Sequence, residues 1–292
     1  WYNIGMSEEE LKSMRHSLAH IMAQAIQHLW PQAKFGVGPA IDNGFYYDIY
    51  LDNGTISEAD LPKIEEEMRK IVAANYPFER RDVSVAEAID WAIKGDQIFK
   101  MELLNDLKRS GTTVASELAG EKMGSMADGD SKVETVSLYS QGDYTDLCRG
   151  GHVDSTGKVG AFKLTKTAGA YWRGNENNPQ MQRIYGVAFA TQEELDEYLN
   201  RLEVAKQRDH RKLGKELDLY TTSPLVGIGL PLFTPRGTIL RDIVAQYSNQ
   251  LRQKFGFEKV WTPHITKKDL YETSGHWAKF GEELFLVKSQ ET

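Results

Sequence analysis

The chain of 292 residues is long enough for about two domains, and its 40% hydrophobic content is ordinary for globular protein with a buried core. A net charge of -7 excludes a uniformly basic nucleic-acid-binding surface but leaves room for a local basic patch. There is no apolar run of roughly 18 residues and no secretory signal pattern, and the single cysteine excludes an internal disulfide, so we expect a cytoplasmic protein.

The first predicted element is a helix that begins after Ser7 and ends before Pro31. Ser7 and Glu10 have the spacing of a capping box. At about 100° per residue, His16 and His20 lie nearly opposite the apolar stripe of this helix. The stripe consists of Leu11, Met14, Leu18, Met22, Ala25 and Leu29. The two histidines therefore belong either to a solvated polar face or to a functional site.

Short strands and helices alternate in the next part of the chain. Strands are predicted at 35–38, 44–51, 78–83, 135–139, 159–167 and 182–190, and helices at 61–74, 84–94 and 98–107. Small and polar residues dominate 110–132, which we interpret as a mobile insertion without core residues.

A second capping box at Thr191 predicts a charged helix that runs to about Leu213. Its basic end is either a solvated face or a contact with a phosphate backbone. A second domain is indicated beyond Leu219. Its predicted elements are a loop rich in proline and glycine at 224–231, a long helix at 237–255, an apolar strand at 257–261 and a short helix at 267–274.

Two histidine-bearing segments concentrate chemically capable groups. The first is HSLAH at 16–20, and the second is DLCRGGH at 146–152, where two glycines permit a sharp bend. His16, His20, Cys148 and His152 are a plausible tetrahedral zinc set. The same groups also suit a metal-free hydrolytic pocket, in which a histidine or a lysine activates water. Asp146 could orient an imidazole or bind a substrate ammonium, whereas Cys148 could equally be an inert buried thiol.

Six segments, in order along the chain, resemble motifs of bacterial threonyl-tRNA synthetases. They are HSLAH at 16–20, GPAIDNGFYYD at 38–48, DLCRGGH at 146–152, KTAGAYWRG at 166–174, QRIYG at 182–186 and RDHRKLG at 208–214. The resemblance implies an α+β fold with an editing domain containing an antiparallel sheet at 1–190, a linker helix at 191–215, and the start of a class II catalytic domain at 216–292. The last part includes motif 1, which helps build the dimer interface in the family. Gly151 stands where the family has proline.

The resemblance also implies a function. The family's full-length enzyme is a threonine–tRNA ligase that attaches threonine to tRNA(Thr) using ATP, and its editing site hydrolyses mischarged seryl-tRNA(Thr). Such a second site is needed because one methyl group gives only about 1–3 kcal/mol of discrimination. The implied catalytic residues are His16, His20, Lys100, Cys148 and His152, and the implied substrate-binding residue is Asp146. We expect tRNA contacts from Lys166, Arg173, Lys206 and Arg211.

The expected cofactors and partners follow from the same resemblance. No cofactor is firmly implied for this chain, and zinc in the editing pocket is the alternative. ATP, Mg²⁺ and a catalytic zinc are expected only for the full-length enzyme, because the family's motifs 2 and 3 would follow Thr292. We therefore do not expect this chain alone to form threonyl-adenylate. The expected partners are tRNA(Thr), seryl-tRNA(Thr) and, in the full-length enzyme, a second copy bound through motif 1; no membrane is expected.

Overall fold

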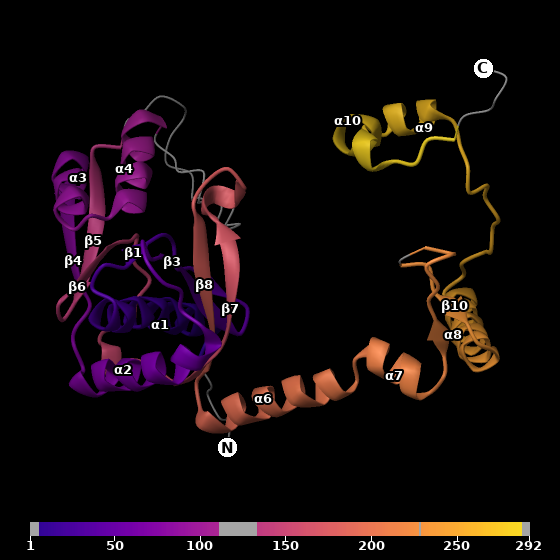
Figure 1. The fold of residues 1–292 in the computed structure, drawn as a ribbon, viewed down its shortest axis with the longest axis horizontal. Helices are drawn as coiled ribbons and strands as arrows, with labels where there is room; N and C mark the ends of the chain where they lie inside the picture. The colour runs from indigo at the N-terminus through magenta and orange to yellow at the C-terminus, as the bar shows by residue number, and fades with distance from the viewer. Residues whose placement is uncertain (1–5, 111–132, 228, 288–292) are drawn as a thin grey trace. The chain divides into compact units, whose positions relative to one another are not determined.

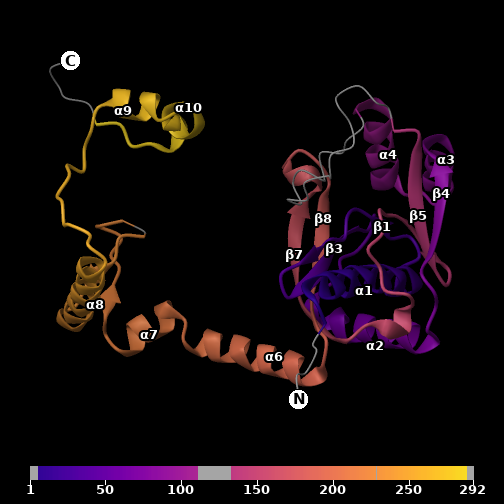
Figure 2. The same ribbon diagram turned by 180° about the vertical axis from the view of Figure 1, so that it is seen from behind.

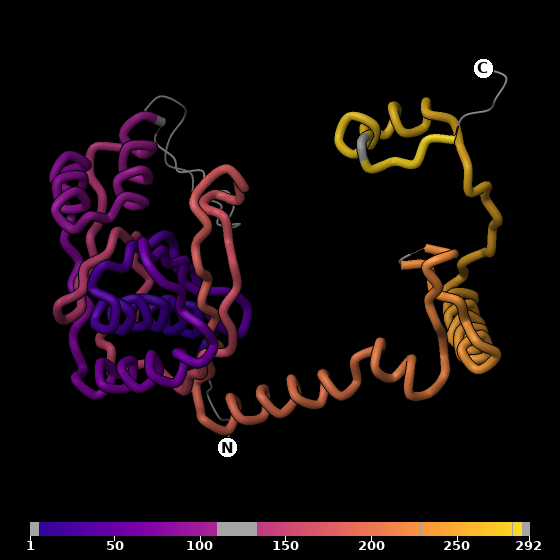
Figure 3. Tube along the Cα trace, viewed as in Figure 1, coloured from indigo at the N-terminus to yellow at the C-terminus, as the bar shows by residue number. Residues whose placement is uncertain are grey.

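The computed structural model describes residues 6–110, 133–227 and 229–287, and the chain divides into two compact units, Trp1–Ala205 and Lys206–Thr292. Figure 3 traces the path of the chain through each unit. In the first unit the helices are α1 (Glu8–Leu29), α2 (Leu61–Ala74), α3 (Val85–Lys94), α4 (Ile98–Ser110) and α6 (Gln192–Gln207), the last of which crosses the boundary. Its strands are β1 (Lys34–Phe35), β2 (Ala40–Ile41), β3 (Gly44–Tyr50), β4 (Glu79–Ser84), β5 (Thr135–Gln141), β6 (Tyr144–Leu147), β7 (Ala161–Tyr171) and β8 (Gln180–Phe189).

Helix α1 begins where the capping box predicts. The Ser7 hydroxyl accepts from the Glu10 N–H at 3.2 Å, and the Glu10 carboxylate accepts from the Ser7 N–H at 2.7 Å. The predicted apolar stripe packs into the main core, with Met14, Leu18 and Met22 fully buried. The opposite side of the helix is buried as well, so the solvated-face interpretation of the histidines is wrong for His20.

Two antiparallel sheets enclose α1. One has five strands in the order β1-β3-β8-β7, with β2 paired to β3, and the other has three in the order β4-β5-β6. Helix α1 contacts β2 and β3 of the first sheet and β6 of the second. Figure 1 shows α2 beside α1, and α3 and α4 alongside the three-stranded sheet; Figure 2 gives the view from behind. This arrangement matches the α+β expectation.

The second unit is described by itself. Its elements are α7 (His210–Glu216), β9 (Tyr220–Thr221), β10 (Leu232–Phe233), α8 (Pro235–Lys254), α9 (Lys268–Thr273) and α10 (His276–Phe280). Its antiparallel pair joins β9 to β10. Among the described residues of the chain, no helix combines the length and apolar character that crossing a bilayer requires.

Three sequence expectations differ from the structure. Of the strand expected at 35–38, only Phe35 lies in a strand, β1. The strand expected at 257–261 is wrong: this segment has no strand partner among the described residues, and Val260 and Trp261 are 78% and 84% exposed. An apolar run cannot form a strand without a neighbour for its backbone groups. The helix expected from Thr191 to about Leu213 is two helices, because Asp209 caps a new start at α7. The predicted insertion at 110–132 lies outside the described residues, apart from the end of α4.

Candidate active site

The two histidine segments form one cluster in the first unit. Helix α1 supplies His16 and His20, one turn apart, and the loop after β6 supplies Cys148 and His152. One ligand atom from each of the four lies within 4.8 Å of the other three. His16 Nε2 lies 2.9 Å from Cys148 Sγ, which lies 3.3 Å from His152 Nε2. The sequence prediction that these groups lie together is therefore met by the geometry.

The loop reaches this geometry through the two adjacent glycines. Gly150 and Gly151 have φ values of 104° and 81°, a region that side chains rarely enter. A Cβ on Gly150 would lie 2.4 Å from the Tyr139 hydroxyl, whereas one on Gly151 would meet nothing within 4 Å. Gly150 is therefore required both for the bend and for the close approach of Tyr139.

Aromatic packing holds the histidine rings in place. The His152 ring stacks on Phe78, with centroids 4.6 Å apart and planes 2° from parallel. His20 packs edge-on against Tyr144 of β6, and its centroid lies 4.4 Å from that of His152. These contacts limit ring rotation, so the nitrogen atoms keep fixed directions.

Burial sets the protonation states in the cluster. It lowers the pKa of His152 and holds the pKa of His20 well below its usual range, with the neighbouring histidines adding to the effect. Burial also raises the pKa of the Cys148 thiol to about 12. His20 and His152 are therefore neutral imidazoles, and Cys148 is a protonated thiol that is a poor nucleophile.

A buried ion pair adjoins the cluster. Lys100 of α4 places its Nζ 2.5 Å from Asp146 Oδ1, and the two side chains are 4% and 3% exposed. Tyr47 of β3 donates its hydroxyl proton to the other carboxylate oxygen and accepts from Lys100 Nζ at 3.0 Å. His20 Nε2 lies 3.8 Å from the same oxygen. Lys100 and Asp146, predicted from resemblance, thus lie together beside the histidines.

Sequence reasoning missed the role of Tyr47 as a partner of this pair. Burial, and then the Asp146 carboxylate, raise the pKa of Tyr47 well above its usual range, so its phenol stays protonated and donates. Its only sequence signal is its place in the GFYYD stretch, which also reads as an ordinary strand.

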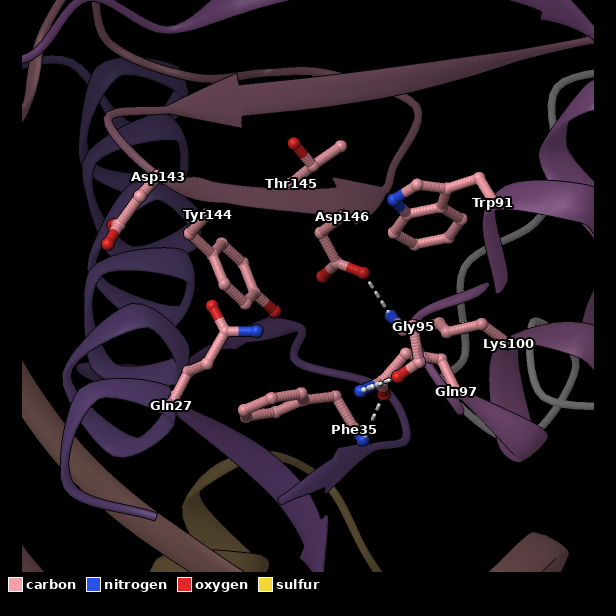
Figure 4. Close-up of a pocket in the computed structure, with 10 residues that line it drawn as sticks. All are labelled: Gln27, Phe35, Trp91, Gly95, Gln97, Lys100, Asp143, Tyr144, Thr145 and Asp146. Carbon is pink, nitrogen blue, oxygen red and sulfur yellow. Dashed lines mark hydrogen bonds and ion pairs between the residues drawn. The ribbon is translucent and has the colours of Figure 1, made fainter. Parts of the chain in front are cut away.

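A cavity of about 160 Å³ opens onto the ion pair. Figure 4 shows Lys100 and Asp146 among its lining residues, with Phe35, Trp91 and Tyr144 supplying aromatic walls. The four histidine and cysteine residues of the cluster are not among the lining residues of this cavity. A small polar group entering here would therefore meet the ion pair directly.

The predicted tRNA-binding residues belong to both units, two to each. Lys166 lies on β7 with its Nζ 4.8 Å from the centre of the Tyr185 ring. Arg173 pairs with Asp106 at 2.6 Å and is largely engaged inside the first unit. Lys206 and Arg211 belong to the second unit, where Arg211 pairs with Asp209 at 2.8 Å. Both residues are exposed.

The cluster also fits a metal by its chemistry. Three imidazoles and one thiol are the donors that zinc takes in tetrahedral sites. His20 Nδ1 is buried without a hydrogen-bond partner among the described residues, as a nitrogen directed at an ion would be. His16, His20, Cys148 and His152 would hold such an ion, which would supply a polarised water.

Comparisons with known proteins agree with the predicted resemblance. Residues 136–185 match the family described as the second additional domain of threonyl and alanyl tRNA synthetases. The chain is 48% identical over 280 residues to threonine–tRNA ligase 1 of Bacillus subtilis (strain 168), and 46% identical over 271 residues to the threonine–tRNA ligase of Porphyromonas gingivalis (strain W83). These alignments cover 96% and 92% of this chain but only 40% and 38% of the relatives. The resemblance is confirmed, and the chain spans about 40% of the length of such relatives.

Proposed function

We propose that this chain hydrolyses the ester bond of seryl-tRNA(Thr), as the editing part of a threonine–tRNA ligase. The carrying observation is the buried Lys100–Asp146 pair, which sits 3.8 Å from a neutral histidine of the cluster. So many buried titratable groups do not stabilise a hydrophobic core, whereas acid–base catalysis requires them. The similarity to threonine–tRNA ligases supplies the substrate class.

The hydrolysis needs no covalent intermediate. Water adds to the ester carbonyl carbon and loses a proton to a histidine of the cluster, and the same proton passes to the ribose oxygen as its bond to the carbonyl carbon breaks. Cys148 stays protonated and does not attack. Lys100, paired with Asp146, positions the water and stabilises the negative oxygen that develops. Asp146 lines the same cavity as Lys100 and binds the serine ammonium.

Specificity is the reason for a second site. A synthetic site that accepts threonine rejects serine by only about 1–3 kcal/mol, since serine lacks a single methyl. A small, rigid editing pocket reverses the preference by excluding that methyl. The stacked and edge-on rings around His152 and His20 provide such rigidity.

A deacylation assay tests the proposal. The purified chain is mixed with seryl-tRNA(Thr) or threonyl-tRNA(Thr), and we expect loss of the seryl ester only. His16→Ala and Cys148→Ala should slow this loss, whereas His276→Ala, which changes an exposed histidine of the second unit, should not. An unchanged rate in the first two variants would remove the site assignment. No hydrolysis by the parent chain would favour a tRNA-binding module instead.

A zinc-dependent aminoacyl-tRNA hydrolase is the second candidate, favoured by the donor set and by the unpartnered His20 Nδ1. Metal analysis of the purified chain separates the two candidates. Stoichiometric zinc, with hydrolysis lost on chelation and restored by zinc, would replace the metal-free mechanism.

The remaining assignments belong to the same proposal. We assign editing to 1–190, a linker helix to 191–215 and part of a class II catalytic domain to 216–292, in a cytoplasmic enzyme. Ile239, Ile243 and Tyr247 of α8 are 61%, 57% and 62% exposed, which supports a dimer interface there. ATP, Mg²⁺ and a catalytic zinc are assigned to the longer enzyme.

Lys206 and Arg211 are assigned to the tRNA backbone. Lys206→Ala or Arg211→Ala should weaken tRNA binding in a salt-dependent way, because each removes a phosphate-facing charge. Single-turnover hydrolysis at saturating enzyme should stay unchanged, and a slower chemical step would contradict the assignment.

A further inference from the structure

Ser17 lies between the two histidines of α1 and is completely buried. Its hydroxyl makes three contacts: 2.9 Å to the Ser13 carbonyl, 3.0 Å to the Val153 N–H, and 3.2 Å to His152 Nδ1. The first ties it to its own helix, and the other two reach the loop that carries Cys148. Ser17 therefore connects the two histidine segments.

The number of protons fixes the direction of each bond. A serine hydroxyl has one proton to donate and two lone pairs that accept. The Ser13 carbonyl can only accept, so it takes the hydroxyl proton, and the Val153 N–H can only donate. The contact with His152 must use the second lone pair, so His152 Nδ1 carries a proton and donates it to Ser17.

The consequence reaches the centre of the cluster. A neutral imidazole has one N–H and one bare nitrogen, so a proton on Nδ1 leaves Nε2 bare. That Nε2 lies 3.3 Å from Cys148 Sγ and accepts the thiol proton. The sulfur lone pairs then accept from His16 Nε2–H at 2.9 Å and from the Gly150 N–H at 3.3 Å. Each of these bonds has one donor and one acceptor.

We propose that Ser17 is a positioning residue that selects the Nδ1–H tautomer of His152 and so directs the bare Nε2 toward the Cys148 thiol. The catalytic consequence rests on the proposed function, but the tautomer does not. Without the hydroxyl, the Nε2–H tautomer becomes available, and its proton replaces the lone pair that accepts from the Cys148 thiol.

Nitrogen NMR of histidine-labelled protein measures the tautomer directly. His152 is assigned by loss of its signals in His152→Gln, at a slightly alkaline pH where the ring is neutral. We expect the parent chain to show the Nδ1–H form, and Ser17→Ala to show a mixture or the Nε2–H form. Single-turnover hydrolysis of seryl-tRNA(Thr) by Ser17→Ala should fall on the order of 10-fold or more, while Ser17→Thr keeps the hydroxyl and most of the rate.

Thr156 offers a matched control. Its hydroxyl is equally buried, donates to the Ile71 carbonyl and accepts from the Tyr76 N–H, and it has no hydrogen bond to a histidine within the described part of the chain. Thr156→Val should lower stability and leave both the tautomer and the rate unchanged.

Two results would overturn the proposal: an Nε2–H tautomer in the parent chain, or a Ser17→Ala variant with the parent's tautomer and rate. If the parent chain does not hydrolyse seryl-tRNA(Thr) at all, the proposed function fails, and the NMR measurement still decides the role of Ser17.

Discussion

Removing the positive partner of the buried ion pair should strongly destabilise the first unit. In Lys100→Met, the Asp146 carboxylate keeps its proton donor Tyr47 but loses the ammonium 2.5 Å away, in a place where its side chain is 3% exposed. Breaking a buried pair typically costs about 3–5 kcal/mol, because the remaining charge is neither solvated nor paired. Protonation of the carboxyl relieves part of this cost, so we expect a loss near the lower bound at neutral pH.

Urea unfolding, followed by the fluorescence of the buried Trp172, measures the loss. Adding Asp146→Asn to Lys100→Met removes the unpaired charge, so the double variant should be more stable than Lys100→Met alone. Lys166→Met, which removes an exposed lysine, should change the unfolding free energy by less than about 0.5 kcal/mol. A loss below about 1 kcal/mol in Lys100→Met, or a double variant no more stable than it, would refute the reasoning.

Two further predictions concern α1. Burial lowers the pKa of His28, but its bonds to Asp143 and Glu67 outweigh this and leave the pKa raised, so the stability it contributes is full below the ordinary value of 6.5 and is lost as the pH rises through the raised pKa. Urea unfolding over a pH series should show that the unfolding free energy declines less with rising pH in His28→Gln than in the parent chain. An unaltered pH dependence would exclude this role. Ser7→Ala removes the hydroxyl of the capping box and should cost about 0.5–2 kcal/mol in thermal unfolding, whereas no change in melting temperature would show that the cap contributes little.

Local signals were sufficient for much of the fold. The capping box at Ser7 located the start of α1, and an acidic-then-basic helical pattern predicted α2 at Leu61–Ala74. These elements depend on residues a few positions apart. The apolar run at 257–261 gave the same kind of signal for a strand but was misleading, because a strand requires a distant partner that spacing along the chain does not reveal.

The candidate site likewise has features that local sequence predicts and contacts between distant residues that it does not. The angle of His16 and His20 away from the apolar stripe and the two glycines before His152 were visible in the sequence, and the structure brings these segments together. The Lys100–Asp146 contact joins α4 to β6 across 46 residues, and the hydroxyl of Ser17 meets a ring 135 residues away. Such contacts depend on the packing of the two sheets around α1, so no local pattern predicts them.

Helix α1 makes constrained contacts on two opposite sides. Met14, Leu18 and Met22 pack into the core on one side, and on the other side His16 Nε2 lies 2.9 Å from Cys148 Sγ. Any repacking of the core that rotates α1 moves the histidines through the same angle. The packing of the core therefore determines where the histidine side chains lie relative to Cys148. A substitution in the core that does not contact the cluster, such as Met22→Ala, should therefore displace the histidine side chains.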